Sequence, residues 1–237
     1  MNFSSLFGYK NPIKTDIHSH LLPGIDDGVK TIKDAIAIVK KFKLLGYTKL
    51  ITTPHIMSDA YPNNPSIINE KLQLLREAIH EENIDIDIEA SAEYYVDMPF
   101  LELIEEEELI TFKENYVLFE TAYNAKPLIL EQAIFEMTEK GYIPVLAHPE
   151  RYMYLHNDIE RYKQLKVLGV LFQVNIRSLD KQSSSINKTA QKLVKLGLVD
   201  FLGSDVHRMR DIDKIEKILQ SSNYKQAIKN NNILNNQ

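Results

Sequence analysis

Seven short apolar, β-branched runs alternate along this chain with segments whose apolar residues recur at helical spacing. Two of the helical segments end at Gly46 and Gly141, as helices closed by a C-terminal glycine do. Alternation of this kind predicts strand–helix units and a mainly parallel sheet. The seven predicted strands are residues 13–18, 49–53, 84–89, 116–120, 143–147, 170–174 and 199–203.

The alternation favours an α/β fold, with a (β/α) barrel as the first choice and a doubly wound open sheet as the alternative. The chain has 237 residues, a length that α/β barrels reach as one domain. No linker rich in proline, glycine or serine divides it. We therefore expect a single domain over residues 1–237, with a frayed tail at 230–237, where the sequence reads NNNILNNQ.

Composition excludes several classes of function. The chain has no cysteine, so a disulfide, a thiolate zinc site and a cysteine nucleophile are all excluded. Its formal net charge of −5 argues against a nucleic-acid partner. No apolar run approaches the roughly 18 residues that span a bilayer, and residues 1–14 lack the pattern of a signal peptide. We expect a cytoplasmic protein without membrane insertion.

Side chains that can bind metal stand at the carboxyl end of every predicted strand except 170–174. In both candidate folds these ends meet at one edge or mouth, so the side chains are expected to converge. Their donors are nitrogen and oxygen without sulfur, which suits zinc, manganese or iron. The nine candidate ligands are His18, His20, Asp27, His55, Glu93, Glu120, His148, Asp205 and His207.

Nine donors are too many for one ion, so we expect a cluster of two or three divalent metals with bridging carboxylates. Such clusters generate a hydroxide nucleophile and hold the oxygens of a transferring group, as phosphatases and nucleases require. A single histidine after a strand is more often a hydrogen-bonding residue, and an aspartate there is often a helix cap. These structural roles do not explain why nearly every predicted strand is followed by a side chain that can bind metal. His80 and His156 lie outside this pattern and are expected to be non-functional.

The motifs resemble those of the PHP (polymerase and histidinol phosphatase) superfamily. "DIHSHLLPGIDDG" is similar to its first motif, and "TPH", "AEYY", "FE", "AHPERY" and "SDVH" follow in the order of the superfamily. Together they cover about residues 10–220. The combination most resembles the capsular-polysaccharide-type bacterial metal-dependent tyrosine-protein phosphatases.

This resemblance implies a distorted (β/α)7 TIM-like barrel of the PHP type with a trinuclear metal centre. Manganese is favoured, with iron, zinc or cobalt as alternatives. It implies that Glu93 bridges two metals, that the nine candidates are the ligands, and that Asp16 orients a histidine. The implied activity is hydrolysis of phosphotyrosine by a metal-bridging hydroxide. The implied partner is the tail of a bacterial tyrosine kinase that controls capsular or exopolysaccharide synthesis.

Arginine is scarce in the chain, with six residues against 22 lysines, and four of the six follow the later strands. Arginine binds phosphate through two parallel hydrogen bonds, which lysine does not. The resemblance assigns phosphate binding to Arg151 in "HPERY" and to a second arginine after the last motif. Because the spacing there differs from the family pattern, we choose Arg210, with Arg208 as the alternative.

Asp205 or His207 is the candidate general acid, provided that metal binding does not engage it fully. Tyrosinate leaves readily, so strong acid assistance is not required, and no phosphoenzyme is needed. Three alternatives stay open: a histidinol-phosphate phosphatase or another PHP phosphoesterase, a PHP-type exonuclease, and a metal-binding module without activity. The exonuclease is disfavoured by the acidic net charge.

Overall fold

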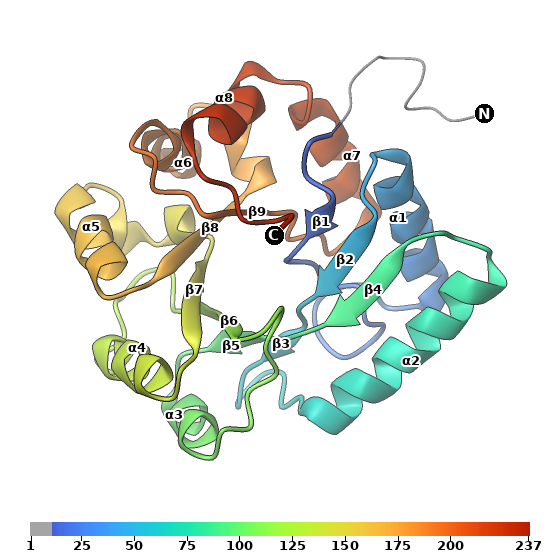
Figure 1. Cartoon of the computed structure of the whole chain (residues 1–237), viewed down its shortest axis with the longest axis horizontal. Coiled ribbons are helices and arrows are strands. Elements are labelled where there is room, and N and C mark those ends of the chain that lie inside the picture. Colours follow the sequence, from blue (N-terminus) through green and yellow to red (C-terminus); the bar gives the residue numbers. More distant parts are fainter. Residues whose placement is uncertain (1–10) are drawn as a thin grey trace.

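The computed structural model describes residues 11–237 and shows parallel strands surrounded by helices (Figure 1). The smaller sheet has the order β1-β2-β4, and the larger has the order β3-β5-β6-β7-β8-β9. Every strand pair in both sheets is parallel. The strands are β1 (Thr15–Asp16), β2 (Lys49–Thr52), β3 (His55–Ile56), β4 (Asp87–Ala90), β5 (Glu93–Tyr95), β6 (Tyr116–Glu120), β7 (Ile143–Ala147), β8 (Leu171–Asn175) and β9 (Phe201–Gly203).

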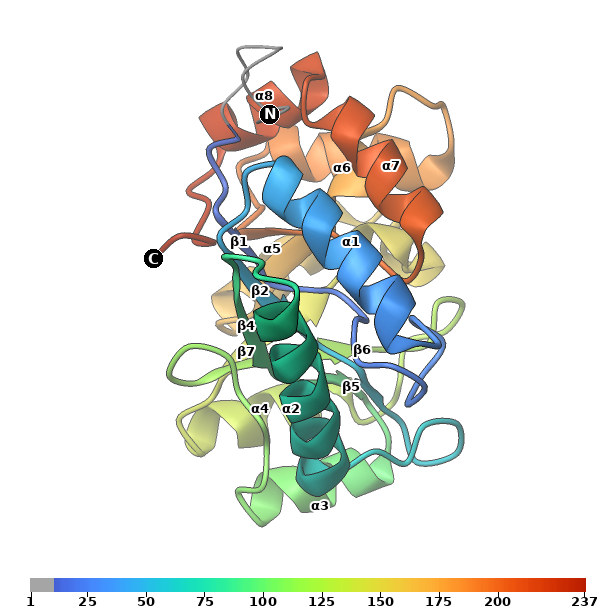
Figure 2. The ribbon, with the colours of Figure 1, turned by 90° about the vertical axis from the view of Figure 1, so that its right-hand side faces the viewer.

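Helices follow most of the strands, so the predicted α/β class with a parallel sheet is confirmed. Figure 2 shows α1, α2 and α7 packed side by side on one flank of the molecule. The helices are α1 (Ile32–Leu44), α2 (Pro65–Glu81), α3 (Met98–Glu105), α4 (Leu130–Glu139), α5 (Ile159–Val167), α6 (Ser185–Lys195), α7 (Met209–Ile218) and α8 (Ser222–Asn230).

Local sequence explains where α1 begins and ends. Its N-cap residue Thr31 accepts a hydrogen bond from the backbone N–H of Asp34, which satisfies a free donor of the first turn. After the last turn, Gly46 adopts a φ of 89°, and Gly141 adopts a φ of 80° after α4. The predicted glycine caps are thereby confirmed, since this backbone region favours glycine.

All seven predicted strands are present, with bounds shifted by a few residues, and two further strands were not predicted. The second predicted run continues beyond Pro54 as β3, and the third continues beyond Ser91 and Ala92 as β5. Each break carries the chain from the smaller sheet to the larger one. As a result, His55 and Glu93 are the first residues of short strands rather than loop residues.

The segments that follow β1 and β9 lie side by side. A parallel bridge joins Ser19 to Val206, and the backbone N–H of Asp205 donates to the His18 carbonyl over 2.7 Å. Asp16 was expected to orient a histidine, and this is wrong. Its two oxygens instead accept from the backbone N–H and the hydroxyl of Ser204, at 2.9 and 2.7 Å. Burial raises the pKa of Asp16 to about 7.

The frayed tail expected at residues 230–237 is also wrong. Asn235 is only 1% exposed, and its side-chain oxygen accepts from the backbone N–H of Leu202 over 3.0 Å. Its amide nitrogen donates to the carbonyls of Leu202 and Thr15, at 2.8 and 2.9 Å. The side-chain amide imitates a backbone group and completes the ends of β1 and β9. The polar composition of the tail suggested fraying, but the side-chain amide of Asn235 holds the tail in place.

Replacement of Asn235 by alanine is expected to lower the free energy of unfolding by about 2–4 kcal/mol. Three backbone groups near the core would lose their partners, and each unpaired group is costly. Urea unfolding followed by circular dichroism measures this loss. Asn232→Ala is the matched control, since Asn232 is exposed. A loss below about 0.5 kcal/mol for Asn235→Ala, the range of ordinary surface substitutions, would contradict the anchoring role.

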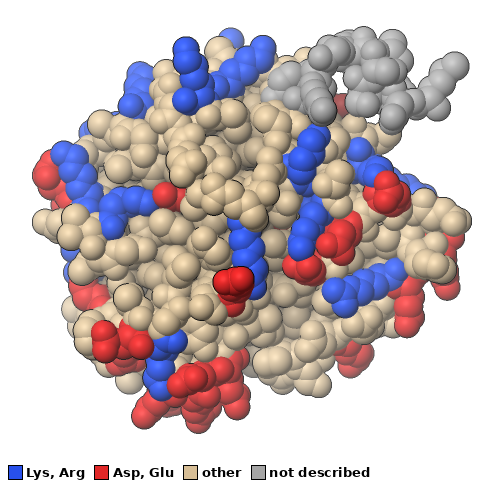
Figure 3. All heavy atoms as spheres, viewed as in Figure 1, with Lys and Arg blue, Asp and Glu red and all other residues tan. Residues whose placement is uncertain are grey.

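Figure 3 shows charged side chains of both signs, with basic ones more frequent toward the upper edge and acidic ones toward the lower edge. Exposed ion pairs on the protein include Lys40 with Glu82 and Lys43 with Asp85. Isolated pairs of this type contribute little to stability. Within residues 11–237, none of the helices combines the length and the apolar character needed to cross a membrane.

Candidate metal centre

The structure brings all nine predicted donors together in one cluster. Their donor atoms form four overlapping groups, and within each group the atoms lie within 4.8 Å of one another. Most of these side chains are buried. The groups are His20, Asp27, His55 and His207; His18, His20 and Asp205; His18, Glu93 and His148; and His55, Glu93 and Glu120.

Glu93 lies at the centre of the cluster and is 1% exposed. Its Oε2 atom is 3.1 Å from His18 Nε2, 3.4 Å from His20 Nε2 and 3.3 Å from His55 Nδ1. Its Oε1 atom is 2.9 Å from His148 Nε2. The two oxygens of one carboxylate thus face different histidines, which is the arrangement that a bridging ligand needs.

Three histidines are oriented by acceptors outside the donor set. His18 Nδ1 donates to Gln173 Oε1 over 2.6 Å, and His20 Nδ1 donates to Asp26 Oδ2 over 2.7 Å. His207 Nδ1 lies 3.1 Å from the backbone oxygen of Asp205. Each acceptor holds the proton on Nδ1 and directs Nε2 into the cluster, as is usual for metal-binding histidines.

Proton affinities in the cluster are strongly shifted. Burial disfavours the charged imidazole, yet the Asp26 carboxylate raises the pKa of His20 to about 10. Burial likewise opposes charge on His55, but Glu93 and its neighbours raise the pKa of His55 to about 12. In return, the histidines hold the pKa of Glu93 well below its usual range despite its burial. Protons therefore compensate the carboxylates wherever no other cation does so.

The cluster fits divalent metal ions. Asp27 Oδ1 lies 3.2 Å from His207 Nε2, and His55 Nδ1 lies 3.2 Å from Glu120 Oε1, yet neither buried atom forms a hydrogen bond with the described residues. Donor atoms that converge without hydrogen bonds to one another have the arrangement of metal ligands. The donors are imidazole nitrogen and carboxylate oxygen, which zinc, manganese and iron accept.

Metal binding at pH 7 is expected to release at least about two protons per chain. The raised pKa values of His20 and His55 place a proton on each ring that a bound metal would displace. Calorimetric titration with Zn²⁺ in two buffers of different ionisation enthalpy measures the number of protons released. A release near zero, with metal bound, would contradict this account of the cluster.

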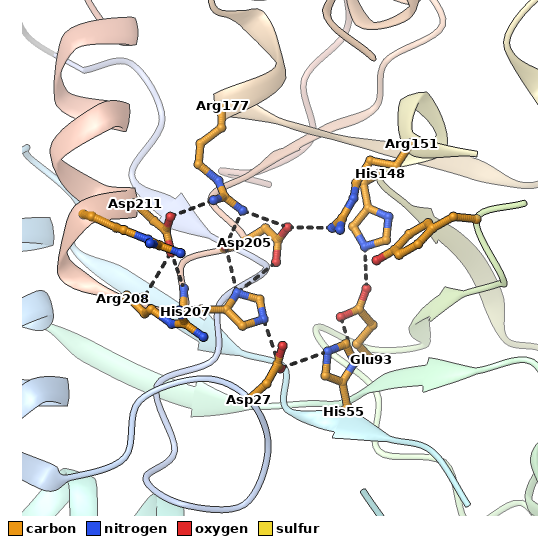
Figure 4. Close-up of a pocket in the computed structure, with 12 residues that line it drawn as sticks. Asp27, His55, Glu93, His148, Arg151, Arg177, Asp205, His207, Arg208 and Asp211 are labelled. Atoms are coloured by element: carbon orange, nitrogen blue, oxygen red, sulfur yellow. Dashed lines mark hydrogen bonds and ion pairs between the residues drawn. The ribbon is translucent and has the colours of Figure 1, made fainter. Parts of the chain in front are cut away.

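A cavity of about 300 Å³ opens onto the cluster (Figure 4). The Arg151 guanidinium lies 4.5 Å from the centre of the Tyr123 ring, and its Nη1 atom is 3.2 Å from Asp205 Oδ2. Arg177 reaches the same oxygen over 3.2 Å and pairs with Asp211 over 2.7 Å. The two guanidinium groups thus form a positively charged wall beside the donor cluster.

Arg208 and Arg210, the two alternatives for the second phosphate-binding arginine, both line this cavity at the start of α7. Both are exposed, and neither side chain forms an ion pair with another described residue. Arg177 is a further lining arginine to which the sequence assigned no role. The cavity therefore combines metal-type donors with four cationic side chains, a combination suited to a phosphoryl group.

The two histidines expected to be non-functional lie outside the donor groups. His80 is exposed on α2, and His156 Nε2 donates to the backbone oxygen of Glu150 over 2.8 Å. Sequence reasoning missed Gln173 and Asn175, which are buried on β8. The signal was present, because two amides two residues apart interrupt an otherwise apolar run, LFQVN.

Comparison with known proteins agrees with this geometry. The family model for capsular polysaccharide synthesis, CpsB/CapC, matches residues 14–233. CapC of Staphylococcus aureus is 29% identical over 194 residues, which cover 81% of this chain and 76% of CapC. Tyrosine-protein phosphatase YwqE of Bacillus subtilis is 27% identical over 197 residues, which cover 82% and 78% of the two chains.

A solved structure is also similar. It comes from work on YwqE from Bacillus subtilis and CpsB from Streptococcus pneumoniae, which are metal-dependent tyrosine phosphatases. The superposition has a TM-score of 0.79 and a sequence identity of 25%, and it covers 93% of this chain and 96% of that chain. The sequence resemblance is thereby confirmed. The match over residues 14–233 shows that the chain belongs to the CpsB/CapC family of capsular polysaccharide synthesis.

Proposed function

We propose that this protein is a metal-dependent protein tyrosine phosphatase, a hydrolase of phosphoric monoesters. The observation that carries the proposal is a cavity lined by four arginines and by six of the nine clustered metal-type donors. The family match and the tyrosine phosphatases among its relatives support it. We infer that the substrate is phosphotyrosine on the tail of a bacterial tyrosine kinase that controls capsular or exopolysaccharide synthesis.

We propose that the nine donors hold two or three divalent ions, with manganese as the first choice. The four overlapping donor groups support a number above one, because one ion cannot occupy all of them. When bound, such ions lower the pKa of water and neutralise charge on phosphate oxygens. The role of the protein is to fix the donors: Glu93 faces four histidines, and Asp26 and Gln173 hold the orientation of His20 and His18.

Arg151 is proposed to bind the phosphoryl group. Stacking on Tyr123 fixes the plane of its guanidinium, and the contact with Asp205 uses only part of its five N–H donors. The remaining donors are available to two phosphate oxygens, in the geometry that arginine prefers. Tyr123 lines the same cavity and provides an aromatic surface beside the phosphate site. Arg210, or Arg208 in its place, supplies the second positive charge from the rim.

Asp205 is expected to remain a carboxylate rather than act as the general acid. Although burial favours its neutral form, His18 and other cationic neighbours hold the pKa of Asp205 well below its usual range. His207 then stays as the candidate acid, since it lines the cavity. Tyrosinate, with a parent pKa of about 10, needs less protonation than an alkoxide leaving group.

The ring of strands is proposed to be a distorted (β/α)7 barrel. The bridge between Ser19 and Val206 supports closure between the segments after β1 and β9. Asp205 and His20 lie on either side of this junction, whose backbone hydrogen bonds are 2.7 and 2.9 Å long. Closure would explain why donors from the first and the last strands meet at one site.

Arg151→Lys is expected to lower kcat/KM for a phosphotyrosine peptide by about 10²-fold, the usual loss when one preorganised donor to the transition state is removed. Lysine keeps the charge but loses the planar pair of hydrogen bonds and the stacking on Tyr123. Steady-state kinetics of phosphate release measures this loss. Arg161→Lys is the control, because Arg161 pairs with Glu131 away from the cavity. Equal activity of Arg151→Lys and the wild type would contradict the assignment.

The substrate assignment is tested by comparing a phosphotyrosine peptide, histidinol phosphate and a 5′-phosphorylated oligonucleotide on metal-loaded protein. The proposal predicts the highest kcat/KM for the phosphotyrosine peptide. Because the chain has no cysteine, the activity should also resist thiol-alkylating reagents. Faster turnover of histidinol phosphate would identify histidinol phosphate as the substrate instead. Turnover of none of the three compounds would contradict the proposed phosphatase function.

A further inference from the structure

β8 is the one predicted strand that contributes no metal-type donor, yet two of its side chains form hydrogen bonds with proposed metal ligands. Gln173 and Asn175 stand two residues apart and so point to the same face of the strand. Both are buried, with exposures of 0% and 3%. Buried amides are costly unless they are paired, so their hydrogen bonds require an explanation.

The two amides connect two of the proposed metal ligands. His18 Nδ1 is 2.6 Å from Gln173 Oε1. Gln173 Nε2 is 2.9 Å from Asn175 Oδ1, and Asn175 Nδ2 is 2.7 Å from Asp205 Oδ2. An unbroken row of three side-chain hydrogen bonds therefore runs from His18 to Asp205.

The direction of this row is fixed at its Asp205 end. Arg151 Nη1 and Arg177 Nη2 each lie 3.2 Å from Asp205 Oδ2, so Asp205 is a carboxylate, which only accepts hydrogen bonds. Asn175 must therefore present its NH₂ group to Asp205 and its oxygen to Gln173. Gln173 must then present its own oxygen to His18, so His18 carries its proton on Nδ1. The Nε2 atom of His18 is left for the cluster, 3.1 Å from Glu93 Oε2.

The same contacts also select one oxygen of Asp205. Its Oδ2 atom accepts from Asn175 Nδ2, from Arg151 Nη1 and from Arg177 Nη2. Its Oδ1 atom instead faces His18 Nε2 at 3.7 Å and lies in the donor cluster. Three donors on one oxygen thus leave the other oxygen for a metal.

Gly203 supports a packed and specific arrangement. A Cβ atom at this position would lie 2.5 Å from Gln173 Nε2 and 2.9 Å from the Cβ atom of His18. Contacts this short do not occur between real side chains, so the space that Gln173 occupies exists because residue 203 is glycine.

We propose that Gln173 and Asn175 form a positioning relay that sets the tautomer of His18 and the orientation of Asp205 for metal binding. The proposal rests on the proposed metal centre. It assigns to β8, which carries no metal ligand, the role of orienting two ligands on other segments. Neither amide touches the reacting atoms, so both act through the residues that they orient. Removing partners of this kind typically lowers metal affinity by about 10- to 100-fold.

The test measures Zn²⁺ affinity by competition with a chelator for the wild type, Gln173→Met, Asn175→Leu and the double variant. Both substitutions approximate the shape of the amide and remove its hydrogen bonds. Each single variant is expected to lose about 10- to 100-fold in affinity. If the amides act as one relay, the double variant loses about as much as a single one, because effects of contacting residues are not additive. Asn235→Ala is the matched control, since it removes a buried amide away from the cluster.

A second readout needs no variant. In ¹⁵N NMR spectra of the zinc-loaded wild type, His18 is expected to carry its proton on Nδ1 and to bind metal through Nε2. A proton on Nε2 would overturn the proposal even if the variants failed to fold. Affinities of both single variants within twofold of the wild type would overturn it as well. Absence of zinc binding by the wild type would instead contradict the metal centre itself, and the relay would fall with it.

Discussion

Glu93→Gln is expected to lower phosphatase activity by at least about 10³-fold, because several kcal/mol of charge stabilisation depend on bound metal. Glutamine keeps the shape of the side chain but removes the charge that faces four histidines. It also replaces one metal-type oxygen by an NH₂ group, which repels a cation. Metal content, measured by mass spectrometry after dialysis, should fall together with activity.

The control for this variant is Glu89→Gln, which changes a carboxylate on β4 that pairs with Lys49. Partly exposed pairs of this kind contribute little, so its activity and metal content should match the wild type. The number of protons released on metal binding should also be lower for Glu93→Gln, because Glu93 raises the pKa values of His18 and His55. Retention of more than a tenth of the wild-type activity by Glu93→Gln would contradict the central position of this residue.

Removal of metal by a chelator is expected to abolish activity and to lower the Tm. A ligand at 100 times its Kd stabilises the folded state by about 2.7 kcal/mol. For a chain of this length that corresponds to a shift of about 5–10 °C. Differential scanning calorimetry of chelated and metal-loaded protein measures the difference. An unchanged Tm, with loss of metal verified, would contradict binding of the metal to the folded cluster.

The difference in Tm should also widen as the pH rises above 6.5. The pKa of His20 is raised to about 10 in the folded protein, so its stabilisation is fully present below the unfolded pKa of about 6.5. That contribution is lost as the pH rises from about 6.5 through 10. The contribution of His55, whose pKa is raised to about 12, is lost in the same way over a wider range of pH. Metal-free protein should therefore lose stability over this window, whereas bound metal replaces the protons. A constant difference between pH 6.5 and 9 would contradict the proposed exchange.

The sequence predicted the α/β class and every long strand because those runs are apolar and alternate with helical spacing. It missed β3 and β5 because each is only two or three residues long and begins three residues after the end of the preceding strand. His55 and Glu93 were nevertheless chosen correctly as members of the converging set, since their side-chain chemistry identified them. Residue type therefore located the donors where local pattern did not locate their strands.

Contacts between distant residues were beyond the reach of the sequence. Asp16 pairs with Ser204, 188 residues away, and so was misassigned to a histidine. Asn235 looked like part of a polar tail, although its amide completes the ends of two strands. In each case the partner is decided by tertiary packing, which composition and spacing do not contain.

We propose that the converging donors form a metal centre that hydrolyses phosphotyrosine. The decisive experiment measures phosphate release from a phosphotyrosine peptide, together with metal content, for the wild type and the His18→Ala/His20→Ala variant. The wild type is expected to bind more than one divalent ion per chain and to turn over the peptide. The variant should lose both properties while keeping its circular dichroism spectrum. Hydrolysis by the variant at the wild-type rate, or by wild-type protein stripped of metal, would contradict the account.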